Sequence, residues 1–192
     1  MSDAVSASSP FARWTSILLH PFAVFAALAL IAAWRMDPAS LPRTAIGMAV
    51  AVAIVWAFVL QRRRSGRLGT VDASDRRERP VLYALVLVVA AGYWLWLGGR
   101  ASATGQGVVA IIAMLCVAGI ANRWIKLSLH MASLAFSGMA LLALWPPAGF
   151  IALVLLPLLA WSRLRMARHT VPEVIGGSLL GLLAGIALRL IG

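Results

Sequence analysis

Three arginines, a histidine and a glutamate occur within the stretch WSRLRMARHTVPEVIGG, residues 161–177, just before the last apolar segment of the chain. An arginine side chain is planar and always charged, and its donors match phosphate oxygens. A histidine serves as a nucleophile or a proton donor near neutral pH. This stretch therefore has the residue types that phosphate chemistry needs.

Two further polar clusters precede that stretch, DASDRRERP at residues 72–80 and KLSLH at residues 126–130. They add arginines, a serine hydroxyl and a second histidine. Two histidines together can divide the nucleophile and acid roles of a phosphoryl transfer. The clusters are far apart in the sequence, so this chemistry requires a fold that brings them together.

The elements that must position these clusters are membrane helices. The 192 residues are 62% hydrophobic and 12% charged, with a mean hydropathy of +0.92, whereas about a quarter of the residues in soluble domains are charged. A spanning helix needs about 20 apolar residues. We expect an all-α integral membrane bundle of about six to seven transmembrane helices, with apolar segments at residues 15–34, 45–60, 81–97, 107–122, 128–145, 149–161 and 172–191.

The chain is expected to form one transmembrane domain, residues 15–192, after a short N-terminal lead, residues 1–14. The lead lacks the basic beginning and small-residue cleavage site of a secretory signal, so we expect it to be retained. Tryptophans lie near most of the predicted helix ends, where their rings favour the headgroup region. Cys116 is the single cysteine and cannot form an internal disulfide.

Seven crossings would place the three polar clusters on one side of the membrane. The lead and the junctions 61–80, 123–127 and 162–171 are each separated by two crossings. Of 17 basic residues, 13 fall on that side: Arg13, Arg62, Arg63, Arg64, Arg67, Arg76, Arg77, Arg79, Arg123, Lys126, Arg163, Arg165 and Arg168. The net charge of +11 is thus typical of membrane topology and not of nucleic-acid binding. We expect a bacterial inner membrane protein with this side in the cytoplasm.

The three clusters resemble, in order, the motifs of the type 2 phosphatidic acid phosphatase family. SRLRMARHTVPE matches its third motif, Ser-Arg, five residues, His, three residues, Asp, with Glu173 at the position of the aspartate. LSLH is similar to its Pro-Ser-Gly-His motif and keeps Ser128 and His130. DASDRRERP is similar to its first motif, Lys, six residues, Arg-Pro, and keeps Arg79, although Asp72 stands at the position of the lysine. The resemblance implies a phosphatase-like core at about residues 72–192.

This resemblance implies a two-step transfer without a metal or other cofactor. His169 would attack phosphorus and form a phosphohistidine, His130 would protonate the leaving alcohol, and Glu173 would hold the imidazole of His169 in the useful tautomer. The phosphate would be bound by Arg79, Arg163 and Ser128, with Arg76 or Arg77 in place of the missing lysine. The expected substrate is a lipid phosphate or a polyprenyl diphosphate. Its headgroup would enter a pocket about the size of a phosphate, and its tail would remain among the membrane lipids.

Each cluster also has a simpler interpretation. Thr170 and Glu173 fit a helix capping box, and His130 could be an interfacial histidine without a catalytic role. His20 precedes Pro21 and is interpreted as structural, while Arg165 and Arg168 are interpreted as headgroup anchors.

Two other functions remain open. A non-catalytic membrane protein that binds anionic lipid headgroups would need only the basic side. A Mg²⁺-dependent transferase would need two carboxylate clusters, and Asp72 and Asp75 form the only close pair in a loop.

Overall fold

The computed structural model describes residues 9–65 and 79–191, and these residues form helices and no strands. The expected all-α class is confirmed. The helices are α1 Pro10–Leu18, α2 Pro21–Met36, α3 Leu41–Arg64, α4 Arg79–Leu97, α5 Gly105–Ala121, α6 Leu129–Leu144, α7 Pro146–Val154, α8 Leu156–Arg165 and α9 Val171–Ile191. Two short 3₁₀ turns, η1 Pro38–Ser40 and η2 Gly99–Ala101, join α2 to α3 and α4 to α5.

Five helical segments of the described residues are long and apolar enough to cross a bilayer. They are Pro10–Met36, Pro38–Arg64, Arg79–Leu97, Pro146–Arg165 and Val171–Ile191. The remaining apolar helices, α5 and α6, have 17 and 16 residues and are shorter than the usual span. Large apolar side chains such as Ile54 and Leu183 are exposed on the outside of the bundle, as expected for a surface in contact with lipid.

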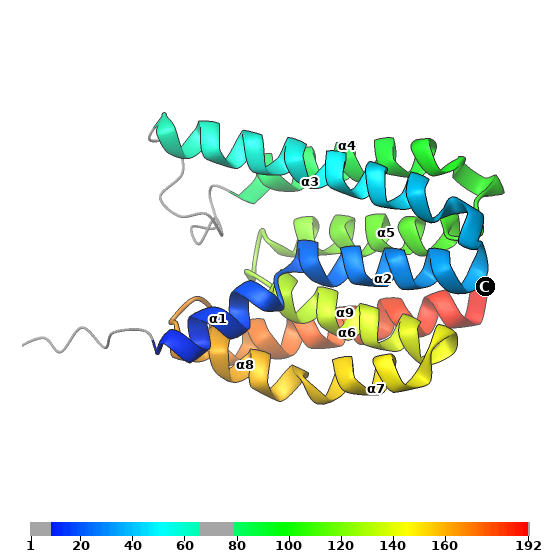
Figure 1. The fold of residues 1–192 in the computed structure, drawn as a ribbon. Coiled ribbons are helices and arrows are strands. Elements are labelled where there is room, and N and C mark those ends of the chain that lie inside the picture. Colours follow the sequence, from blue (N-terminus) through cyan, green and yellow to red (C-terminus); the bar gives the residue numbers. More distant parts are fainter. Residues whose placement is uncertain (1–8, 66–78, 192) are drawn as a thin grey trace, which may run out of the picture.

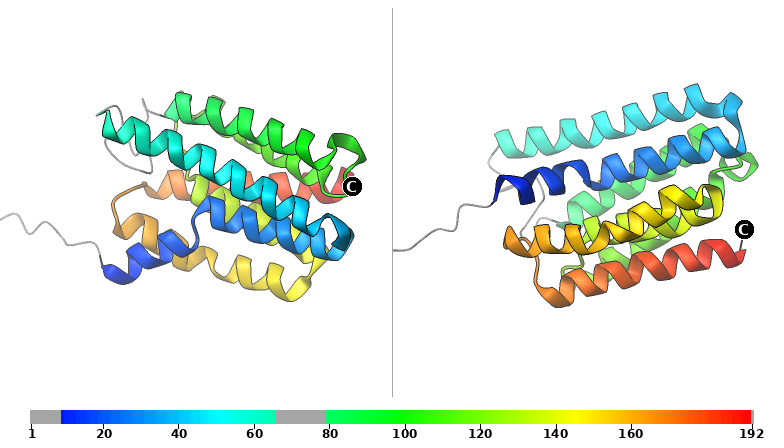
Figure 2. Two further views of the ribbon diagram at one scale, coloured as in Figure 1. Left: turned by 45° about the horizontal axis from the view of Figure 1, so that its top comes forward. Right: turned by 60° about the horizontal axis from the view of Figure 1, so that its bottom comes forward.

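The helices lie side by side and alternate in direction (Figure 1), and the two further views agree (Figure 2). One end of the bundle, opposite the labelled C-terminus, holds His20, Arg79, His130, Arg163 and His169; we call it the polar end. The beginnings of α2, α4, α6 and α9 meet there with the ends of α3, α5 and α8. The chain therefore returns repeatedly to one set of neighbouring termini.

Two of the predicted apolar segments contain breaks. The segment expected at residues 15–34 is divided into α1 and α2 at Leu19 and His20, because Pro21 disfavours helical geometry in the residue before it. Helix α1 already begins at Pro10, so the first helix starts within the expected lead. The sixth segment is longer than expected: α7 and α8 meet at Leu155 and together cover 20 residues.

Helix α6 lies at the centre of the bundle and is buried along most of its length. It packs on α2, α7 and α9, and its contact with α9 depends on small residues. A Cβ atom at Gly177 would meet the backbone of Ser128, and one at Gly181 would meet the backbone of Ala132. Glycine lets the two backbones approach closely, which brings the second and third sequence motifs together.

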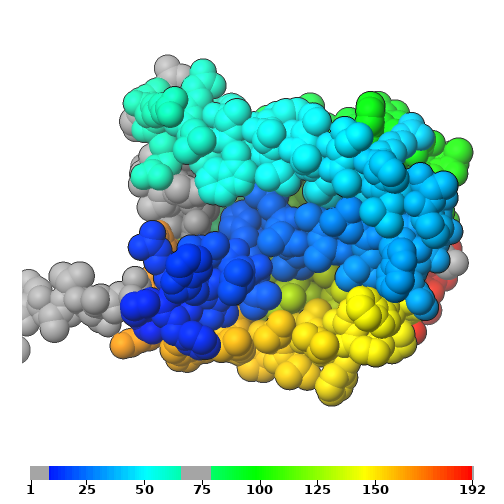
Figure 3. Space-filling model, viewed as in Figure 1, coloured from blue at the N-terminus to red at the C-terminus, as the bar shows by residue number. Residues whose placement is uncertain are grey.

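The space-filling view shows α2 between α3 on one side and α7 on the other (Figure 3). Helix α1 packs against α8 at the polar end. Its buried side chains are Ala12, Thr15 and Ser16, whereas Trp14 and Leu18 are exposed. The helix thus turns one polar face toward the site and an apolar face outward.

Candidate active site

Four of the predicted site residues line a single cavity at the polar end of the bundle: Arg79, His130, Arg163 and His169. They come from α4, α6, α8 and the turn between α8 and α9, and each is at most 7% exposed. The cavity has a volume of about 660 Å³ and continues well into the bundle. The prediction of a pocket about the size of a phosphate is therefore wrong, because the space extends between the apolar helices.

His169 is held by a carboxylate one helical turn further along the chain. Its Nδ1 lies 2.9 Å from Oε2 of Glu173. The same oxygen accepts a hydrogen bond of 3.1 Å from the backbone N–H of Thr170. Glu173 therefore caps the start of α9 and orients the histidine with one oxygen, so the two interpretations of this residue are compatible.

The pKa of His169 is lowered from 6.5 to about 3, chiefly because the ring is buried. The positive charges of Arg163, Arg79 and Lys126 act in the same direction, whereas a hydrogen bond with the backbone of Lys126 acts against it. His169 is therefore neutral at pH 7. A neutral imidazole has one nitrogen with a free electron pair, as a nucleophile requires.

Arg163 is the largest of the almost fully buried side chains, at 2% exposure. Its Nη1 donates a hydrogen bond of 2.6 Å to Oγ of Ser16 in α1. The backbone then reverses: the N–H of Arg168 bonds to the carbonyl of Arg163 at 3.1 Å, and Ala167 has a left-handed φ of 50°. This helix ending is of the Schellman type, and it returns the chain so that His169 reaches the cavity that Arg163 lines.

Arg79 begins α4 and is also buried, at 7% exposure. Its Nη1 donates a hydrogen bond of 2.9 Å to the carbonyl oxygen of Leu127, in the junction before α6. In the same junction, Nζ of Lys126 donates to the carbonyl of Arg168 at 3.0 Å and lies 3.9 Å from Oε2 of Glu173. These contacts join α4, the 122–128 junction and the turn before α9 into one cationic site.

Two buried polar atoms of the second motif have no hydrogen-bond partner among the described residues: Oγ of Ser128 and Nε2 of His130. The backbone of Ser16 hydrogen-bonds to the His130 ring. A buried polar group without a partner costs about 1–3 kcal/mol, so a bound polar ligand would remove a penalty here. His130 lines the cavity, whereas Ser128 is fully buried beside it and does not.

Sequence reasoning missed two contributions from the first apolar segment. Ser16 contacts Arg163 and His130. His20 lines the cavity, and its ring lies 5.0 Å from that of His130 in a perpendicular arrangement. His20 also has the expected structural role, since its Nδ1 accepts the N–H of Phe22 and caps α2. This first apolar segment lies outside the family resemblance. The count of membrane crossings was the only sequence argument that put its beginning at the same end as the motifs.

The remaining predicted residues lie elsewhere. Arg76, Arg77, Asp72 and Asp75 fall outside the described residues. Arg165 is exposed and does not line the cavity.

Comparisons of the chain with protein-family models, with curated proteins and with solved structures found no match.

Proposed function

We propose that this protein is a membrane phosphatase that hydrolyses a lipid phosphate or diphosphate through a phosphohistidine intermediate. The observation that carries the proposal is the 2.9 Å contact between His169 and Glu173 in a cavity that Arg79, His130 and Arg163 also line. A neutral, oriented imidazole, a second histidine and two guanidinium groups around one space form the set that phosphoryl transfer needs. The family resemblance of the three motifs supports the same function.

In the first step, the nitrogen of His169 that Glu173 does not hold attacks phosphorus. A nitrogen–phosphorus bond forms and the bond from phosphorus to the lipid oxygen breaks. His130, which would be held in its protonated form by the bound phosphate dianion, gives its proton to that oxygen. In the second step, His130 takes a proton from water, whose oxygen attacks the phosphohistidine. Inorganic phosphate leaves, and His169 and His130 return to their starting forms.

The arginines supply the charge that stabilises the transition state. Arg79 and Arg163 would each bind equatorial phosphate oxygens, held in place by their bonds to Leu127 and to Ser16. Ser128 is not assigned to the phosphate, because it does not line the cavity. No metal ion is part of this mechanism, because the guanidinium groups neutralise the developing charge.

The proposal includes seven membrane crossings, with α5 and α6 as short spans in the interior of the bundle. Both helices are apolar, and α6 is enclosed by other helices, so it needs less contact with lipid. The excess of basic residues on this side supports an orientation with the polar end in the cytoplasm of a bacterial inner membrane. The C-terminus would then lie outside the cytoplasm. Activity of a C-terminal reporter that works only in the cytoplasm would contradict this orientation.

Phosphate release from a panel of lipid phosphates, measured with EDTA present, tests the function. We expect hydrolysis that EDTA does not inhibit and that the His169→Ala variant lacks. Arg165→Ala is the matched control. This arginine lies two residues after Arg163 on α8, but it is exposed. Binding of anionic lipid without phosphate release would favour the alternative of a non-catalytic lipid-binding protein.

A further inference from the structure

The cavity at the polar end continues through the bundle inside a closed ring of helices. Helix α2 packs on α3, α3 on α4, α4 on α5, α5 on α9, α9 on α6, and α6 on α2. The lining residues follow these helices from Arg79 at the polar end to Leu97 and Leu144 near the other end. The space is therefore an elongated chamber that begins at the site.

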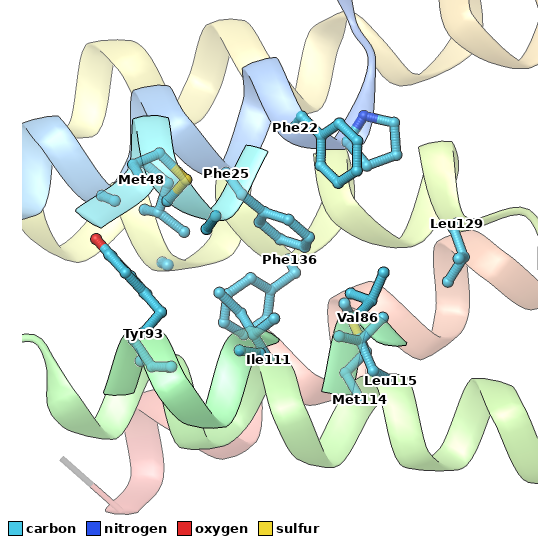
Figure 4. Close-up of a pocket in the computed structure, with 18 of the residues that line it drawn as sticks. Phe22, Phe25, Met48, Val86, Tyr93, Ile111, Met114, Leu115, Leu129 and Phe136 are labelled. Carbon is cyan, nitrogen blue, oxygen red and sulfur yellow. The ribbon is translucent and has the colours of Figure 1, made fainter. Parts of the chain in front are cut away.

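The walls of this chamber beyond the site are mostly apolar, with the tyrosines Tyr83 and Tyr93 along them and the polar side chains of Gln106 and Arg189 at the far end. Figure 4 draws Phe25, Val86, Ile111 and Phe136 around the same space, from four different helices. Cavities lined by such side chains stay dry and accept apolar molecules. The apolar middle of the chamber therefore suits a hydrocarbon.

The chamber is long enough for the tail of a lipid. Arg79 and Leu97 both line it and are 18 residues apart on α4, which corresponds to about 27 Å. The volume of about 660 Å³ leaves room for a hydrocarbon tail in addition to the phosphate.

The length limits the size of that tail. An extended chain advances about 1.3 Å per carbon, given a carbon–carbon bond of about 1.5 Å, so about 20 carbons reach the far end.

We propose that the chamber holds a hydrocarbon tail of up to about 20 carbons of a phosphate ester, while the phosphate lies at the polar end. The substrate class is then a long-chain alkyl, prenyl or acyl phosphate ester whose tail is bound inside the protein. The assignment of the phosphate end rests on the proposed function. The tail lies inside the protein, in contrast to the expectation that it remains in the bilayer.

A substitution halfway along the chamber tests the inference by chain length. Ala90 lines the chamber 11 residues after Arg79 on α4, about 16 Å along the helix. Ala90→Phe should block a hexadecyl chain and leave room for an octyl chain. Ala91→Phe is the matched control, because Ala91 is the next residue on the same helix, is exposed and does not line the chamber.

The measurement is equilibrium binding of octyl phosphate and hexadecyl phosphate to the purified full chain in detergent. We expect Ala90→Phe to weaken hexadecyl phosphate binding at least tenfold and to change octyl phosphate binding less than twofold. Ala91→Phe should change neither. Equal binding of hexadecyl phosphate by Ala90→Phe and the native chain would overturn the inference.

A second pair of variants keeps the test decisive if Ala90→Phe does not fold. Gly107 lines the chamber on α5, near the end opposite the site, and a Cβ atom there meets nothing within 4 Å. Gly107→Phe should weaken binding of eicosyl phosphate but not of octyl phosphate. Gly92→Phe is its control, since Gly92 has the same open surroundings and does not line the chamber.

The outcomes separate this inference from the proposed function. Binding does not require turnover, so the chain-length effects should persist in His169→Ala. If they persist and no lipid phosphate is hydrolysed, the phosphatase proposal fails and the chamber assignment stands. If phosphate is released equally from octyl phosphate and from hexadecyl phosphate, and Ala90→Phe changes neither rate, the phosphatase proposal stands and the chamber assignment fails.

Discussion

Oε2 of Glu173 lies 2.9 Å from Nδ1 of His169 and, through the same oxygen, accepts the N–H of Thr170. The first turn of α9 therefore fixes the histidine ring. Glutamate is one methylene longer than the aspartate of the family motif, and its carboxylate still reaches the imidazole. The proposed nucleophile is thus oriented by the helix that follows it.

Glu173→Gln should reduce turnover by roughly 10²-fold, at the lower end of the usual range for groups that assist proton transfer. The amide oxygen still accepts the N–H of Thr170, so the cap remains and the melting temperature should change little. The missing charge removes stabilisation of the histidine during attack. A measured kcat equal to that of the native chain would show that Glu173 is only a helix cap.

The two histidines should respond differently to truncation. His169→Ala should abolish both hydrolysis and any trapped phosphoenzyme, because no other group forms the covalent intermediate. His130→Ala should slow hydrolysis by roughly 10²–10⁴-fold, and less for substrates with good leaving groups, which need little protonation. Steady-state rates with a nitrophenyl and an alkyl phosphate compare the two cases. Equal losses for both substrates would exclude His130 as the acid.

The pH profile should have its acidic limb below pH 6.5. The pKa of His169 is lowered by burial and by nearby positive charges, so the ring remains neutral, and able to attack, as the pH falls through the usual range of histidine. The value of kcat/KM should therefore decline only at lower pH. Lys126→Met removes one of these charges and should move the acidic limb to higher pH. If kcat/KM declines at the same pH in Lys126→Met as in the native chain, this account is contradicted.

Gly177→Ala should lower stability and turnover together. The added methyl group would meet the backbone of Ser128, so α9 must move away from α6, at a cost of about 1–3 kcal/mol. The same movement displaces Glu173, whose carbonyl accepts the N–H of Ser128 at 3.1 Å. Thermal unfolding and phosphate release provide the two readouts. Gly92→Ala is the control, because a Cβ atom there meets no neighbour, and it should change neither.

The sequence by itself determined the helical class, the approximate positions of the apolar segments and the gathering of basic residues at one end. These features are local, because hydrophobic length and charge are properties of consecutive residues. The number of crossings then decides at which end each junction lies. The same reasoning placed Arg79, His130, Arg163 and His169 at one end without any knowledge of their distances.

Only the tertiary structure decided which helices are neighbours around the bundle. Crossing number fixes the end of the membrane at which a residue lies, but it contains no information about lateral order. The contacts of Ser16 with Arg163, and of His20 with His130, depend on α1 and α2 packing beside α8 and α6. The chamber exists because six helices pack into a ring. The hydropathy of the sequence does not specify the order of the helices in that ring. Its apolar lining residues have the same composition as residues that face lipid, so sequence alone does not distinguish an internal wall from an external one.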